Sequence, residues 1–500
     1  MVEMEHKSFW QLEEGPLFGP LSGDIHVNTV IVGAGICGLL CAYFLQRKGV
    51  RDIAVIDSGK VCAGVSANTT AKITSQHGLI YAKLIKGLGE ERAAQYLAAN
   101  QKAIRDFREI ITRERIDCDH TQASAWVYTL TQERLQDIED EIIAVQKLGI
   151  AASFSTKAEL PFPVKGAIVF PEQAYFHPLK FAFRICDIIS KAGCKIYTDT
   201  KATGAEDGVV YTDRGSILAE NIISCSHYPF IDKRSLLFTK VFQSRSYVLA
   251  LKNAGTIRDI YLDCEEGGFS LRPQRDVDGG EMILLGAYDH KSGHEDESLH
   301  FDDLRGEAQR YYPGHETAYI WSAQDCMTHD KIPYIGRYRT AGENIYIATG
   351  FNKWGMTSSM AAADIISDLV TKGSSDYSGA FCLSRGDIGL QAKSFVKEAA
   401  DIAGNFLTNL TMADRSLKSI NKGEGGVVEI DGKRVGVYRD AAGQIYALKP
   451  VCTHMGCAIK WNKDENTWDC RCHGSRFDYK GYVIGGPALE PLERVEIKRE

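Results

Sequence analysis

The sequence lacks an apolar run long enough to span a membrane, and its longest apolar stretches are of strand length. It also lacks a basic surplus: 58 Lys and Arg residues stand against 65 Asp and Glu, a net charge of −7, which leaves no electrostatic footprint for nucleic acid. The first residues lack the charged-then-apolar form of a secretory signal. These absences predict a cytoplasmic protein with no transmembrane segment and no nucleic-acid partner.

The composition is that of a large globular enzyme. A chain of 500 residues with 44% apolar residues can bury sizeable cores and suggests about three domains. Fourteen cysteines are scattered along it, and several, such as Cys37, Cys41, Cys186 and Cys194, stand in apolar runs. This usage is typical of reduced thiols in a cytoplasm.

Four residues of metal-ligand type stand near the C-terminus. Cys452-Thr-His454 is followed by Cys470-Arg-Cys-His473, which gives the pattern C-x-H and C-x-x-H. This is the ligand set of a Rieske [2Fe–2S] centre, in which one iron takes two thiolates and the other takes two imidazoles. Imidazole donates less charge than thiolate. The reduction potential of a Rieske cluster therefore lies at about −150 to +300 mV, rather than at the about −400 mV of all-cysteine clusters. The pattern therefore predicts a protein that moves single electrons.

A tetrahedral zinc site is the alternative for the same four side chains. Zinc takes two Cys and two His readily, but its ligands usually stand as like pairs, C-x-x-C and H-x-x-x-H. Here each pair mixes one Cys with one His. The spacing favours the iron–sulfur cluster.

The stretch CTHMGC…CRCHGS resembles the Rieske module of respiratory and photosynthetic cytochrome complexes. The resemblance implies a disulfide between Cys457 and Cys472, the cysteines beside the two ligand loops. It also implies that Gly485-Gly-Pro-Ala488 is the loop that covers the cluster.

A dinucleotide fingerprint stands at the other end of the chain. Residues 28–32 read as a strand, Gly33, Gly35 and Gly38 as a glycine turn, and residues 39–47 as a helix. A second strand at 53–56 ends in Asp57. In such a unit the glycines shape the turn and admit a pyrophosphate at the helix N-terminus, and the acid accepts from a ribose hydroxyl. The strands, the helix and the acid together make the fingerprint specific.

Further motifs decide between FAD and a nicotinamide nucleotide. No second fingerprint is present; Gly423-Glu-Gly-Gly426 falls in a polar, hairpin-like stretch. Two more groups stand where a flavin would be contacted: the loop residues Asn68, Thr69 and Thr70, and the strand–turn–helix residues Gly350, Gly355, Met356 and Thr357. These motifs resemble the D-amino-acid dehydrogenase, glycine oxidase and sarcosine oxidase superfamily over residues 25–375, which implies FAD as the cofactor.

At full length the chain resembles a bacterial family of FAD-dependent oxidoreductases with a C-terminal Rieske domain. The expected fold class is α/β: a Rossmann-type FAD-binding domain with an inserted α+β substrate domain, plus a small all-β Rieske domain. We expect the FAD-binding domain at 26–85, 165–235 and 325–375, the substrate domain at 86–164 and 236–324, a linker with an amphipathic helix at 376–412, and the Rieske domain at 413–500.

Candidate catalytic residues are few because amine dehydrogenation by a flavin needs orientation more than acid–base chemistry. The Arg272 guanidinium can bind a substrate carboxylate through two parallel hydrogen bonds. The equally weighted alternative is that Arg272 is a structural residue on a strand. Lys353 and Trp354 stand in the turn expected at the flavin. The residues that bind the substrate carboxylate in this superfamily cannot be matched one by one to positions in this sequence.

The predicted function is a flavin-dependent oxidoreductase that dehydrogenates an amine or amino-acid-like substrate. Electrons then pass singly to the Rieske cluster and on to an unknown acceptor, a protein or a quinone. The alternative is a redox-sensing or electron-transfer protein without an organic substrate, and a reductase fed by nicotinamide is disfavoured by the missing second fingerprint. A Rieske oxygenase is not expected, because such an enzyme needs a large mononuclear-iron domain after the cluster, and few residues follow His473 here.

Overall fold

The structure is a computed structural model that describes residues 6–206, 208–231, 237–293, 297–385 and 416–497. The chain divides into two compact units. Unit 1 consists of Met1–Leu237, Ser246–Asp289 and Leu304–Asp387, and unit 2 of Phe238–Arg245, His290–Asp303 and Ile388–Glu500. The division inside unit 1 between an FAD-binding and a substrate domain stays a prediction.

A sheet of eight strands forms one half of unit 1, in the order β16-β17-β10-β1-β2-β7, with β9 beside β10 and β8 beside β9. The strands β17, β10, β1, β2 and β7 run parallel, as expected for a strand–helix–strand nucleotide unit. The bounds are β1 (Ile25–Val32), β2 (Ile53–Ile56), β7 (Lys195–Tyr197), β8 (Ala202–Glu206), β9 (Val209–Thr212), β10 (Gly215–Ser224), β16 (Tyr334–Arg337) and β17 (Ile345–Thr349).

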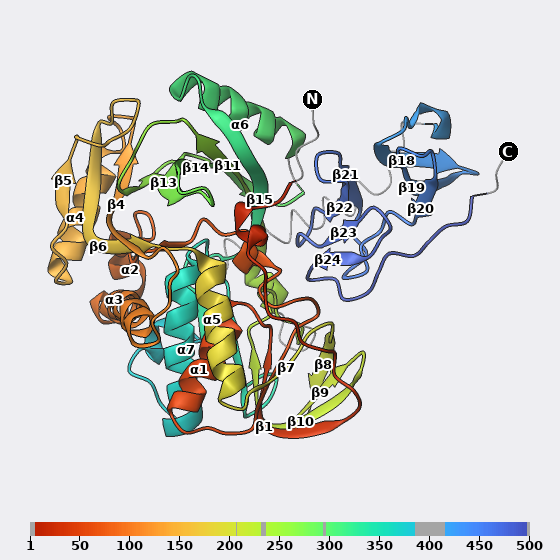
Figure 1. Ribbon diagram of the computed structural model, residues 1–500, viewed down its shortest axis with the longest axis horizontal. Helices are drawn as coiled ribbons and strands as arrows, with labels where there is room; N and C mark the ends of the chain where they lie inside the picture. The colour runs from red at the N-terminus through yellow and green to blue at the C-terminus, as the bar shows by residue number, and fades with distance from the viewer. Residues whose placement is uncertain (1–5, 207, 232–236, 294–296, 386–415, 498–500) are drawn as a thin grey trace. The chain divides into compact units, whose positions relative to one another are not determined.

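Three helices lie side by side against this sheet: α1 (Ile36–Arg47), α5 (Pro178–Lys191) and α7 (Gly355–Lys372) (Figure 1). Their packed faces are apolar, and Leu39, Leu40 and Leu45 of α1 are fully buried. The start of α5 is set locally, because the His177 side chain accepts from the Lys180 N–H and Pro178 takes the first helical position. The other helices of unit 1 are α2 (Tyr81–Leu88), α3 (Glu90–Arg113), α4 (Leu135–Lys147) and α8 (Ser378–Phe381).

A second, mostly antiparallel sheet of nine strands follows the order β15-β11-β14-β13-β12-β4-β6-β3, with β5 on β6. The bounds are β3 (Lys72–Ile73), β4 (Thr121–Thr129), β5 (Ser153–Ser155), β6 (Gly166–Tyr175), β11 (Val241–Lys252), β12 (Ile260–Asp263), β13 (Ser270–Arg275), β14 (Glu281–Lys291) and β15 (Glu316–Thr328), and α6 (Glu297–Tyr311) follows β14.

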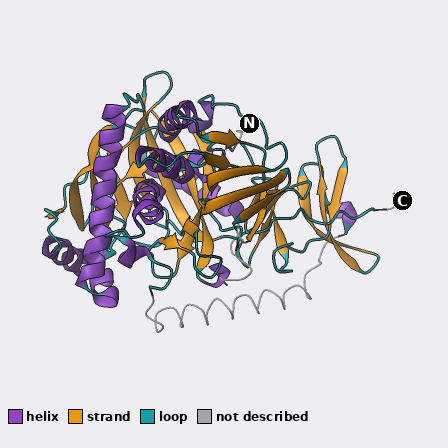
Figure 2. Cartoon of the chain, turned by 90° about the horizontal axis from the view of Figure 1, so that it is seen from below, coloured by secondary structure: helices purple, strands orange, loops and turns teal. Residues whose placement is uncertain are grey.

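The C-terminal part of unit 2 consists of two small antiparallel sheets. Figure 2 shows strands and loops there, with a short 3-10 helix at Leu417–Ser419. The sheets are β18 (Glu424–Ile430), β19 (Lys433–Arg439) and β20 (Ile445–Leu448), and then β21 (Ile459–Asn462), β22 (Thr467–Cys470), β23 (Arg476–Asp478) and β24 (Val483–Gly485). The expected all-β domain is confirmed, whereas the linker helix expected near 389–412 lies outside the described residues. Across the ranges that are described, the helices are all too short or too polar to cross a membrane.

Candidate active site and cluster site

The first glycine turn joins β1 to α1 and tolerates no side chain at two of its positions. Gly33 has φ +111°, and a Cβ there would lie 2.5 Å from the Cys225 carbonyl oxygen. A Cβ on Gly38 would lie 1.9 Å from the Gly33 carbonyl oxygen. The first and third glycines are therefore required by the close packing of the strand, the turn and the helix.

The middle glycine leaves the helix N-terminus open. Gly35 is the N-cap of α1 and has no capping side chain; the Ile36 N–H donates to the Ser66 hydroxyl at 3.2 Å, and the next N–H groups of the first turn remain for an anionic ligand. This arrangement fits the pyrophosphate of FAD. Asp57 steadies the turn, because its two carboxylate oxygens accept from the Ala34 N–H at 2.7 Å and the Gly59 N–H at 2.9 Å. Its contact with a ribose hydroxyl stays a prediction.

The loop Asn68–Thr70 is held by three side chains from distant parts of unit 1. The Trp321 indole N–H donates to the Asn68 carbonyl at 3.0 Å, and the Trp10 indole N–H donates to the Thr69 carbonyl at 2.7 Å. The Arg272 Nε donates to the Thr70 carbonyl. Three successive carbonyls are thereby turned into the protein, and the loop is fixed beside the pocket described next.

A pocket in unit 1 brings together segments from six regions of the chain. Its wall includes the predicted loop residues Asn68, Thr69 and Thr70 and the helix-start residues Gly355 and Met356. The turn before that helix is in the left-handed region at Asn352 (φ 50°) and Lys353 (φ 71°). The remaining lining residues are Val65, Lys72, Ser246, Val248, Leu262, Gly268, Ser270, Gly286, Ala287, Asp289, Ala323, Asp325, Lys353 and Trp354.

Two carboxylates and one ammonium form a charged group in this pocket. The Lys353 Nζ lies 3.5 Å from the nearer Asp289 carboxylate oxygen. Burial opposes ionisation of Asp289, but the Lys353 ammonium and the Gly267 N–H hold its pKa below the usual value. Burial raises the pKa of Asp325, and the nearby Lys353 only partly offsets the effect. The pocket thus offers one firmly ionised carboxylate and one that takes up a proton more readily.

Lys72 adds a second amine to the pocket. Its Nζ donates to the Thr70 hydroxyl at 2.8 Å and to the Ser270 hydroxyl at 2.6 Å. Burial, helped by the nearby positive charge of Arg272, lowers the pKa of Lys72 to about 7. The charge of the pocket therefore changes near neutral pH.

Of the three candidate catalytic residues, Lys353 and Trp354 line the pocket and Arg272 does not. The Trp354 ring stacks on His77, with ring centroids 4.7 Å apart and planes 15° apart. The Arg272 guanidinium is fully buried and donates to the carbonyls of Thr70, Pro273 and Phe176 and to the Gln274 side chain. Its donors are occupied by the protein, so the geometry gives it the structural role that the sequence left open.

Thr357 is another predicted contact that lies outside the pocket wall. Its hydroxyl donates to the Thr74 carbonyl at 3.0 Å and lies 3.1 Å from the His77 Nε2. Gly350 lies in the turn before α7, and its carbonyl accepts from the Asn352 side chain at 2.7 Å. Neither residue lines the pocket.

The four predicted cluster ligands stand on two matching loops of unit 2. The Gly456 N–H donates to the Cys452 carbonyl at 2.9 Å, and the Gly474 N–H donates to the Cys470 carbonyl at 3.0 Å. The imidazoles of His454 and His473 face one another with ring centroids 4.9 Å apart. The predicted disulfide joins Cys457 and Cys472 and so ties the two loops together.

The donor set fits a [2Fe–2S] cluster. Cys452, Cys470 and His473 are buried, and neither ring nitrogen of His473 has a hydrogen-bond partner among the described residues. A buried imidazole without such a partner is costly unless it ligates a metal. Phe238, in the same unit, packs its ring edgewise at 5.6 Å from the His473 ring and 6.1 Å from the His454 ring.

The fold and the two sites define a flavoprotein joined to a Rieske module. The FAD dependent oxidoreductase family matches residues 28–369, and the Rieske [2Fe-2S] domain family matches residues 411–496. The chain belongs to the FAD-dependent oxidoreductases of this family, binds FAD, and carries a C-terminal Rieske domain that binds a [2Fe–2S] cluster.

Proteins similar to this chain agree with this combination of domains. A Bacillus subtilis (strain 168) protein described as a Rieske 2Fe-2S iron-sulfur protein, YhfW, is 37% identical over 98% of both chains. The cytochrome b6-f complex iron-sulfur subunit of Trichodesmium erythraeum is 39% identical over 17% of this chain and 45% of its own length. Glycine oxidase from Geobacillus kaustophilus has a similar fold, with a TM-score of 0.62 at 18% identity, covering 72% of this chain and 99% of that one. The L-proline dehydrogenase of P. horikoshii has a TM-score of 0.59 at 17% identity, covering 71% and 95%.

Proposed function

We propose that this oxidoreductase dehydrogenates a small molecule that carries an amine, and that its Rieske cluster takes the electrons one at a time for delivery to a separate acceptor, a protein or a quinone. The proposal rests on the pocket beside the loop Asn68–Thr70. The side chains of Asp289, Asp325 and Lys353 converge in this pocket. Two carboxylates stand against the paired Lys353 ammonium and Lys72, whose pKa of about 7 leaves it mostly neutral above neutral pH, so there the pocket favours a cationic group over an anionic one.

The pocket residues have different roles toward such a substrate. Asp289, held ionised by Lys353, supplies a fixed negative charge that orients the ammonium group. Asp325, whose pKa burial raises, accepts the ammonium proton, because only the neutral amine can give up a hydride. FAD, when bound, supplies the hydride acceptor. The substrate thus gives one proton to Asp325 and one hydride to the flavin, two electrons in all, and leaves as an iminium ion.

Pocket charge also bears on the substrate class. The Arg272 guanidinium is not available to bind an α-carboxylate of the substrate, because its N–H groups donate to acceptors within the protein. We therefore propose an amine without an obligatory α-carboxylate as the preferred substrate. A cytoplasmic location remains our proposal, supported by the cysteines other than the disulfide pair and the two cluster ligands, which form no disulfide and are mostly buried.

The test is anaerobic mixing of the purified holoprotein with primary and secondary amines, amino acids, NADH and NADPH. Flavin absorbance and the electron paramagnetic resonance of the reduced cluster are followed together. We expect amines to bleach the flavin and the cluster signal to follow. Asp325→Asn should slow bleaching by about 10²–10⁴-fold, whereas Glu316→Gln, an exposed acid at the start of the same strand, should leave it unchanged.

Other outcomes assign other functions. Bleaching by NADH or NADPH alone would identify a nicotinamide-fed reductase. Bleaching by no organic donor would favour the electron-transfer or redox-sensing protein. A bleached flavin beside a cluster that stays oxidised would refute transfer within the chain.

A further inference from the structure

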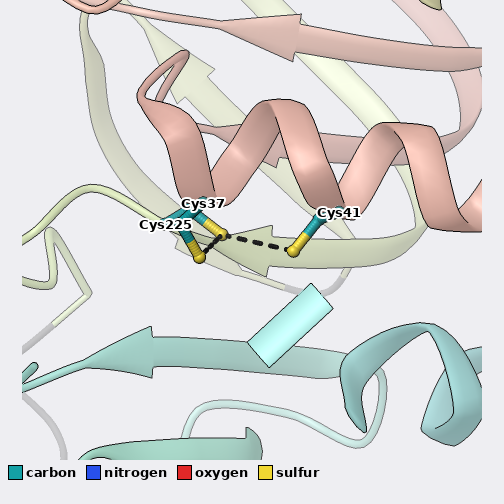
Figure 3. A group of neighbouring side chains, drawn as sticks. All are labelled: Cys37, Cys41 and Cys225. Atoms are coloured by element: carbon teal, nitrogen blue, oxygen red, sulfur yellow. Dashed lines mark hydrogen bonds between the residues drawn. The ribbon is translucent and has the colours of Figure 1, made fainter. Parts of the chain in front are cut away.

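Three cysteine side chains of unit 1 converge beneath the first glycine turn, and none of them lines the pocket or belongs to the predicted cluster ligands. Cys37 and Cys41 stand one helical turn apart on α1, and Cys225 directly follows β10. Their sulfur atoms point toward one another (Figure 3). The Sγ of Cys225 lies 3.5 Å from that of Cys37 and 3.8 Å from that of Cys41, and all three sulfurs lie within 4.8 Å of one another.

The convergence follows from the topology of the first sheet. Strands β1 and β10 are parallel neighbours, with Val32 paired to Ser224, so the residues after both strands meet at one edge. The Cys225 carbonyl is the atom that a Cβ on Gly33 would strike. On α1 the spacing of four residues places Cys37 and Cys41 on the face that packs toward that point. All three thiols are buried.

The simplest alternative is three small apolar side chains that fill space, since free cysteine is often buried. That alternative explains burial but gives no reason for three thiols at one point. Elsewhere in the described residues, such a group occurs only at the cluster loops, where the ligand Cys470 lies beside the Cys457–Cys472 disulfide. A disulfide would use two of the three sulfurs and would need them about 2.05 Å apart.

We propose that Cys37, Cys41 and Cys225 form a three-thiolate binding site for one soft metal ion of the Cu(I) class. Ligands about 2.3 Å from a common ion stand about 4 Å from one another, which is the separation of these sulfurs. Thiolates select soft ions, and no His, Asp or Glu of the described residues joins the group. Zinc in a closed site takes four ligands, so a three-coordinate ion fits better.

The binding step leaves every oxidation state unchanged. Three S–H bonds break, three protons leave to solvent, and three metal–sulfur bonds form around an ion that remains monovalent. The first-turn position of Cys37 favours its thiolate, because the positive end of the α1 dipole lies there.

This position links the ion to the flavin site. A metal–thiolate group of net negative charge and a dinucleotide pyrophosphate would share the N-terminus of α1. Like charges at one helix end oppose one another, so binding of either should weaken the other by the same factor. The thiol site rests on the sulfur geometry alone and does not depend on the proposed amine dehydrogenation.

The test uses the holoprotein with its cluster and flavin, titrated anaerobically with Cu(I) against a chromophoric Cu(I) chelator. We expect the protein to bind one equivalent of Cu(I) tightly, and X-ray absorption at the copper edge should show three sulfur neighbours at about 2.3 Å. Cys41→Ala should weaken the affinity for this Cu(I) ion by at least about 100-fold. Cys118→Ala, which removes a buried thiol elsewhere in unit 1, should leave it intact.

Parallel measurements make each outcome decisive. Iron content and the cluster signal show whether copper has displaced the cluster instead. Cys225→Ala serves as the second ligand variant if Cys41→Ala fails to fold, as judged by thermal unfolding. Equal affinity in the ligand and control variants, a copper shell containing oxygen or nitrogen, or a Cys37–Cys225 disulfide recovered by peptide mass spectrometry would each overturn the site. Failure of amines to reduce the flavin would leave the copper result untouched.

Discussion

The backbone N–H of Ala488 donates to the Oγ of Ser475 at 3.0 Å. The Ser475 hydroxyl lies near the Cys452 thiol and is one of the groups that hold its pKa below the usual value. Because the oxygen accepts from Ala488, its proton stays available to the cluster ligand. Phe477, two residues later, is fully buried in the same apolar group as Cys452 and Cys470. The cluster site therefore holds one hydroxyl donor and one position where a second could be added.

Ser475→Ala should lower the midpoint potential of the cluster. A hydrogen bond to a thiolate stabilises the more negative, reduced state, so its loss disfavours reduction. A bond worth about 1 kcal/mol corresponds to roughly 40–50 mV for one electron. Phe477→Tyr should raise the potential by a similar amount. Protein-film voltammetry measures both, and a Phe477→Tyr midpoint that stays level or falls would refute the hydrogen-bond explanation.

Gly35 and Gly38 should respond differently to substitution. A Cβ on Gly35 meets only the Ser66 hydroxyl, at 3.1 Å, and the backbone at Gly35 is extended (φ −76°), so Gly35→Val should fold. Its side chain would occupy the space expected for the pyrophosphate, and we expect loss of the yellow colour. Gly38→Ala forces a collision with the Gly33 carbonyl and should lower the thermal midpoint as well. A yellow Gly35→Val protein would contradict the placement of FAD.

The sequence predicts those parts of the sites whose residues lie close together in the chain. The cluster ligands and the glycine turn have fixed spacing because a tight loop or a strand–turn–helix unit imposes it. Asp289 and Asp325 end or occupy long strands and reach the pocket only through the sheet order, which no local pattern encodes. Lys72 likewise depends on the two-residue strand β3.

Arg272 shows why residue type alone misleads. Its strand was predicted, but which acceptors its guanidinium meets depends on the loop at Thr70, far away in sequence. The indole bonds of Trp10 and Trp321 to that loop had no sequence signal either, since a buried Trp near a terminus or on a strand is ordinary.

His454→Cys should abolish the low-average-g electron paramagnetic resonance signal of the reduced cluster. Replacing an imidazole by a thiolate adds negative charge at the iron, so the potential should fall toward the value of about −400 mV found for all-cysteine clusters. The matched change His315→Cys, in unit 1, should alter neither the signal nor the potential. Stoichiometric zinc without iron or sulfide in the wild-type protein would instead establish the zinc alternative.

Lys72 should make the binding of a cationic amine depend on pH. Its pKa of about 7 means that the side chain is neutral above neutral pH and charged below it. A second positive charge in the pocket repels the substrate, so the dissociation constant should rise as pH falls through about 7, by roughly 5–10-fold for about 1 kcal/mol of repulsion. In Lys72→Met that rise should disappear, whereas the titrations of Asp325 and of the amine itself remain.

Stability supplies an independent check on the same lysine. An unfolded lysine titrates near 10.4, so between about pH 7 and 10 the unfolded state binds a proton that the folded Lys72 does not. The free energy of unfolding of the wild type should therefore rise with pH across that window relative to Lys72→Met. Urea unfolding at pH 7 and pH 9 measures the difference. Parallel pH dependence in the two proteins would show that Lys72 stays charged in the fold, and the pH dependence of binding would then need another cause.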